Sequence, residues 1–82
     1  MIIQVTKDDI KNGKRLNDCQ CPIALAFKRN GFESVKVTRH FVELEGFDFE
    51  LPFEAENFVK DFDNKKNVEP FQFKVEGLSI CN

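Results

Sequence analysis

The sequence predicts a single α+β domain of two layers, with two helices packed on one face of a mainly antiparallel sheet of four or five strands. Several short segments alternate apolar and polar residues with period two, which is typical of half-buried strands. Two longer segments, at 21–31 and 52–63, carry helix signals. The predicted order is β, short α, α, β, β, β, α, β within one domain, residues 1–82, in which 77–82 form a flexible tail.

The central helix is predicted from CPIALAFKRNG, Cys21 to Gly31. Pro22 suits a first helical turn, and Gly31 suits a left-handed cap. Lys28 and Arg29 fall in the last turn, where cations meet the negative end of the helix dipole. The five residues after Pro22 are all apolar, so we expect this helix to be covered on most sides and to centre the core.

The segments before this helix predict a short strand and a short helix. The β-prone run at 2–6 forms the first strand, with Ile3 and Val5 on one face. Thr6 is a suitable N-cap for the acids that follow it, and Gly13 ends the helix within one or two turns. Residues 14–20 are polar and form a connector.

The segments after the central helix predict a strand, a β-hairpin, a second helix and a last strand. Two alternating runs meet at Glu45-Gly46, which favours a hairpin. Pro52 opens an amphipathic helix, and Pro70 precedes the last strand. The inward residues are Ile3, Val5, Ile23, Leu25, Phe27, Val35, Val37, Val42, Leu44, Phe47, Phe49, Leu51, Phe58, Val59, Phe62, Phe71, Phe73 and Val75.

Composition and charge exclude several classes of protein. The net charge is −2, but residues 1–42 sum to +4 and residues 43–82 to −6, which argues against direct nucleic-acid binding. No segment predicts a secretory signal or a membrane span, so we expect a cytoplasmic protein. Three cysteines do not fit a closed disulfide framework, and the ten phenylalanines are expected to fill the core.

Four carboxylates of the predicted hairpin alternate with core residues and should share the wet face of the sheet. Like charges side by side repel, so this pattern indicates a docking surface for a basic partner, or a mimic of nucleic-acid phosphates. The alternative is an ordinary solvated face that Lys36 and Lys74 neutralise. The predicted partner-binding residues are Glu43, Glu45, Asp48 and Glu50.

Basic residues form two further clusters in the sequence. One contains Lys7, Lys11, Lys14 and Arg15; the other contains Lys28, Arg29 and Arg39. Either cluster is a candidate for binding an anionic ligand, although no glycine-rich phosphate loop is present. Solvated charge is the alternative interpretation.

The cysteines allow a thiol or a zinc hypothesis. A thiol at a helix N-terminus has a lowered pKa, so Cys21 is a candidate nucleophile or redox centre; the alternative is a buried cap. Cys19, Cys21, His40 and Cys81 have the ligand types of a zinc site, but the C-x-C spacing is tighter than usual. We therefore expect no metal and no cofactor.

Several motifs resemble a family of small uncharacterised proteins of phages and bacteria: DDIKNG, CPIALAFKRNG, LPFEAENFVKDFD and VEPFQFKVEG. Relatives in that family often carry C-x-x-CP, whereas this chain has C-x-C-P, so Cys21 matches the motif and Cys19 does not. The resemblance implies an accessory protein of a phage or mobile element. Inhibition or sequestration of a host component is a common role of such proteins.

Three functional hypotheses follow. The first is a non-enzymatic, phage-encoded binding protein that inhibits or sequesters a host defence protein through a protein–protein surface. The second is a sponge for a nucleotide or other small anion, working as a homo-oligomer. The third is a thiol or zinc-binding structural module. We do not expect an enzyme, because no base, nucleophile and orienting group are brought together by the motifs.

Overall fold

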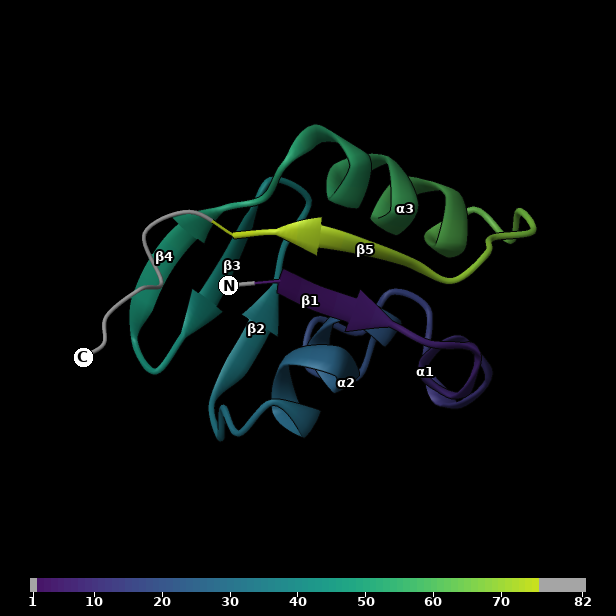
Figure 1. Ribbon diagram of the computed structural model, residues 1–82. Coiled ribbons are helices and arrows are strands. Elements are labelled where there is room, and N and C mark those ends of the chain that lie inside the picture. Colours follow the sequence, from purple (N-terminus) through teal and green to yellow (C-terminus); the bar gives the residue numbers. More distant parts are fainter. Residues whose placement is uncertain (1, 76–82) are drawn as a thin grey trace.

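The computed structural model describes residues 2–75 and confirms the α+β class and the predicted order of elements (Figure 1). Met1 and residues 76–82, which include the whole predicted tail and Cys81, lie outside the described residues. The elements are β1 (Ile2–Val5), α1 (Lys7–Asn12), α2 (Pro22–Arg29), β2 (Val35–Val37), β3 (Phe41–Leu44), β4 (Phe47–Glu50), α3 (Phe53–Asp63) and β5 (Phe71–Lys74).

The five strands form two antiparallel sheets instead of the single sheet expected. β1 pairs with β5, and β2, β3 and β4 pair in that order. Alternation specifies which face of a strand is buried but not which strand lies beside it. Both sheets therefore satisfy the same pattern, each by turning one apolar face to the core.

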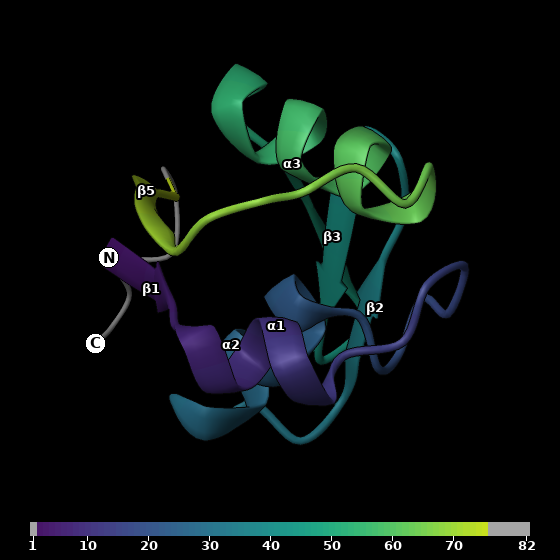
Figure 2. The ribbon, with the colours of Figure 1, turned by 90° about the vertical axis from the view of Figure 1, so that its right-hand side faces the viewer.

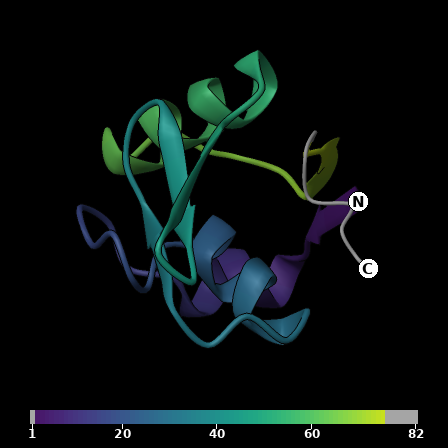
Figure 3. The same ribbon diagram turned by 90° about the vertical axis from the view of Figure 1, so that its left-hand side faces the viewer.

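The core lies between the two sheets and is closed by helices. Figures 2 and 3 show the two sheets on either side of the middle of the molecule, with α3 above it and α2 below. One apolar cluster contains residues of both sheets and of both helices. Ile23, Ala24, Ala26 and Phe27 of α2 have no exposed surface, which confirms that this helix is covered on most sides.

The helix caps explain where the helices begin and end. Thr6 caps α1: its hydroxyl accepts the N–H of Asp9, and the Asp9 carboxylate accepts the N–H of Thr6, forming a capping box. The Cys21 sulfur accepts the N–H of Ala24 at the start of α2. Pro52 precedes α3, whose stripe of Ala55, Phe58 and Val59 is buried.

The hairpin of β3 and β4 turns at Glu45 and Gly46, as predicted. Both residues have positive φ, 52° and 87°, which gives the twist that matches the flanking strands. Phe47 was expected to point inward, but 70 % of its surface is exposed. It stands next to the turn, where the hairpin extends past the core.

Within residues 2–75, no helix is long and apolar enough to cross a bilayer.

Candidate functional site

Three of the four predicted carboxylates share the outer face of the three-stranded sheet. Glu43 lies opposite Asp48 on β4 and opposite Lys36 on β2. Glu50 lies opposite Phe41, two residues along the strands from the Glu43–Asp48 pair and on the same face of the sheet. Register partners project from the same face, and Val42 and Leu44 between them are buried on the other. Glu43, Asp48 and Glu50 are called the acidic face below.

An exposed aromatic ring accompanies the acidic face. Phe41 shares the outer face and is 47 % exposed, whereas Phe47 lies opposite Leu44 and so projects from the other face. Aromatic side chains are enriched at protein–protein interfaces, where they supply large contact areas. Lys36 borders the carboxylates on one side, so the charge of Glu43 is partly balanced there.

Glu45 does not belong to the acidic face. It lies in the turn after β3, and its carboxylate oxygen Oε2 accepts the backbone N–H groups of Glu33 at 2.7 Å and Ser34 at 3.1 Å. The side chain thus fixes the loop before β2. Strand alternation places Glu45 with Glu43, although Glu45 lies in the predicted turn, and alternation does not reveal the distant N–H donors.

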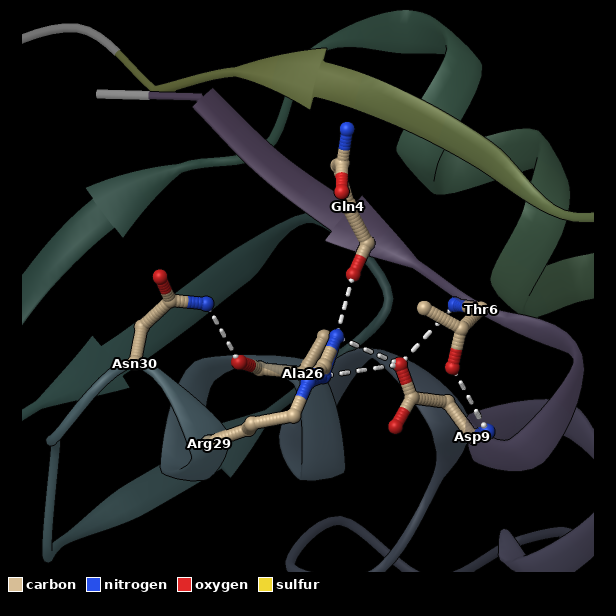
Figure 4. Close-up of polar contacts among 6 residues, drawn as sticks. All are labelled: Gln4, Thr6, Asp9, Ala26, Arg29 and Asn30. Carbon is tan, nitrogen blue, oxygen red and sulfur yellow. Dashed lines mark hydrogen bonds and ion pairs between the residues drawn. The ribbon is translucent and has the colours of Figure 1, made fainter.

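Two of the three basic residues predicted to bind an anion hold the fold together. The Lys28 ammonium donates to the Cys19 carbonyl at 2.7 Å. The Arg29 guanidinium donates to the Asp9 carboxylate at 3.0 Å and to the Gln4 carbonyl at 2.7 Å (Figure 4). Arg29 therefore joins the end of α2 to β1 and to the start of α1.

The third basic residue, Arg39, lies in the turn between β2 and β3. This turn follows β2, whereas Arg29 ends α2 before β2, and Arg29 is directed to Asp9. The neighbouring His40 places its Nδ1 atom 3.4 Å from Glu56 of α3. Lys28, Arg29 and Arg39 therefore have separate contacts and positions, and their grouping as one anion site rests on the sequence alone.

The cysteines favour the structural interpretation. Cys21 is buried as the cap of α2, and burial raises the pKa of its thiol from 9.0 to about 11. This opposes the lowering expected from a helix N-terminus. Cys19 is exposed, and Cys81 lies outside the described residues. Among residues 2–75, no three His, Cys, Asp or Glu side chains are grouped to hold a metal ion.

A groove that sequence reasoning missed lies between the residues that follow α1 and those that follow α3. Its volume is about 700 Å³. The partly buried Ile10, Phe62 and Val68 line it and pack against the core. A backbone hydrogen bond from Leu16 to the Asp63 carboxylate, 3.0 Å long, joins its two walls.

Four cations line the same groove. Lys14 and Arg15 follow α1, and Lys65 and Lys66 follow α3. We call these four residues with Ile10, Phe62 and Val68 the basic groove. The sequence marks Lys14 and Arg15 as part of a basic cluster, whereas Lys65 and Lys66 belong to neither of the two clusters found in the sequence. About fifty positions separate the pairs, so only the fold brings them together.

No family model, curated protein or solved structure matches this chain. The resemblance to small phage and bacterial proteins therefore stays a prediction.

Proposed function

We propose that this chain is a small non-enzymatic binding protein that docks a basic surface of another protein through its acidic face. The observation that carries the proposal is the register of β3 and β4, which sets Glu43 directly beside Asp48 with the exposed ring of Phe41 in the adjacent row. Directly opposed like charges destabilise a sheet. A basic partner would relieve that repulsion and cover the ring.

The resemblance to phage proteins supplies the expected class of partner: a host protein, such as a defence component, that is inhibited or sequestered. The raised pKa of Cys21 supports a role without thiol catalysis.

The test begins with capture of a host protein on the tagged chain and its identification by mass spectrometry. The purified partner is then titrated by calorimetry against wild type and against Glu43→Lys with Asp48→Lys. The loss of two charge pairs should weaken binding by roughly tenfold or more, and added salt should weaken the wild-type complex. A matched control, Glu54→Lys with Glu69→Lys, makes the same charge change at exposed positions on α3 and before β5.

Unchanged affinity in the acidic-face variant would refute the proposal, as would an equal loss in the control. Circular dichroism shows whether each variant keeps the fold. Because Lys36 stands beside Glu43, Lys36→Ala should strengthen binding of a basic partner slightly. The sign of that change separates electrostatic docking from shape fit alone.

A further inference from the structure

We infer that the basic groove binds a nucleoside phosphate, with the phosphates on its cations and the base against Phe62. This site is separate from the acidic face and is independent of the proposed function. Its residues also differ from Lys28, Arg29 and Arg39, the cluster that the sequence suggested for an anion. The inference depends on three features of the groove: its uncompensated cations, its apolar lining and the fixed backbone of the loop after α3.

The charge of the groove is positive and largely uncompensated. Among the ion pairs of residues 2–75, only Lys66 with Asp61, at 4.0 Å, engages one of the four cations. The nearby Asp63 carboxylate accepts the Leu16 N–H through one oxygen. Lys14, Arg15 and Lys65 are exposed, and a cluster of cations is the usual recognition element for phosphate.

Helix dipoles account for only part of this arrangement. Cations near the end of α3 are expected, because the C-terminal end of a helix is negative. Lys14 and Arg15, however, follow a helix of only six residues, whose last turn already holds Lys11. Their presence in the groove opposite Lys65 is better explained by a shared anion.

The apolar lining indicates more than a bare phosphate. Ile10, Phe62 and Val68 line the groove beside the cations. Phe62 also stacks on Phe58 within α3, with ring centroids 6.1 Å apart, which fixes the ring. Any nucleobase can stack on such a ring, because every base has a flat π-face. The volume of about 700 Å³ falls in the range of small-ligand sites.

The backbone at the groove is held in an unfavourable conformation. Lys65 has φ 65°, in the left-handed region, at the position after α3 where glycine is usual. Its N–H donates to the Phe62 carbonyl and that of Lys66 to the Asp61 carbonyl, so the loop is fixed. A lysine at this position costs about 1 kcal/mol relative to glycine, and the fixed loop holds Lys65 in the lining of the groove.

The experiment is a titration of the full chain at low salt, by calorimetry, with ATP and with inorganic triphosphate as probes. Wild type should bind ATP, and it should bind triphosphate more weakly because triphosphate has no base. Lys14→Ala with Lys65→Ala should weaken ATP binding by roughly tenfold or more, since each charge-assisted contact is lost. The matched control is Lys36→Ala with Lys60→Ala, two exposed lysines outside the groove.

The inference would be overturned if wild type did not bind ATP, if it bound triphosphate as tightly as ATP or more tightly, or if the control variant lost as much affinity. All four lysines are exposed, so the variants should keep their fold, and circular dichroism verifies this. Amide chemical shifts of residues 62–68, compared with and without ATP, give a second readout. Shifts confined to other parts of the chain would also overturn it.

Discussion

The buried thiol of Cys21 offers a direct test of whether this residue is a cap or a reactive centre. Burial raises its pKa from 9.0 to about 11, so at pH 8 roughly one molecule in a thousand carries the thiolate, against about one in ten for an unshifted thiol. Since the thiolate is the nucleophile, reaction with a thiol reagent should be slower by about a hundredfold on this ground alone. The assay uses Cys19→Ser with Cys81→Ser, which leaves Cys21 as the only thiol.

The same shift predicts how folding stability depends on pH. Between the two pKa values the unfolded chain loses the thiol proton while the folded chain keeps it, so deprotonation favours unfolding. The contribution of Cys21 to the free energy of unfolding is therefore fully present below pH 9.0 and is lost as the pH rises to about 11. Two pKa units correspond to about 2–3 kcal/mol of unfolding free energy.

The measurement is urea unfolding across this pH range for wild type and for Cys21→Ser. Serine is a good N-cap and does not titrate here, and every other side chain is the same in both proteins. The stability of wild type should fall relative to the variant as the pH rises. Equal pH profiles, or a Cys21 thiol that reacts as fast as a free cysteine, would refute the assignment of Cys21 as a protonated, buried cap.

Three further substitutions test contacts in the fold and the groove by chemical unfolding. Arg29→Ala should destabilise the fold by about 1–3 kcal/mol, because it leaves the buried Asp9 carboxylate without its cation. The loss is limited because the arginine side chain is half-exposed. An unchanged stability would refute the pairing. Gly13→Ala should cost about 1–3 kcal/mol, since a Cβ there would meet the Pro22 ring at 2.6 Å; a neutral result would contradict this packing. Lys65→Gly should stabilise by about 0.5–1 kcal/mol by relieving the left-handed backbone while weakening ATP binding; destabilisation would contradict that argument.

Local signals were sufficient for the elements of this fold. Pro22, an apolar run and a cap defined α2, and the turn at Glu45-Gly46 defined the hairpin, because each signal acts within a few residues. The division of the strands into two sheets was not predicted. It depends on β1 meeting β5, about seventy residues away, and hydrophobic alternation does not encode that pairing.

The contacts at the candidate sites were even harder to predict from local sequence patterns than the strand pairing. Asp9 was recognised as an acid in the first turn of α1, but its burial against Arg29 depends on a contact across twenty residues. Glu45 was assigned to the wet face by strand parity, and the N–H groups that it accepts come from the loop before β2. A T-x-x-D capping box was the one sequence signal that could have placed Asp9 at a fixed position.

The charge of the chain is arranged differently in space than along the sequence. The sequence is basic in its first half and acidic in its second, but Lys65 and Lys66 of the acidic half lie beside Lys14 and Arg15 of the basic half. In Figure 1 the hairpin that carries the acidic face lies at the left, whereas α1 and the end of α3 lie at the right. Exposed charges farther apart than a Debye length, about 8 Å in physiological salt, are largely screened from one another. The acidic face and the basic groove should therefore respond independently to substitution, so Glu43→Lys with Asp48→Lys should leave ATP affinity unchanged.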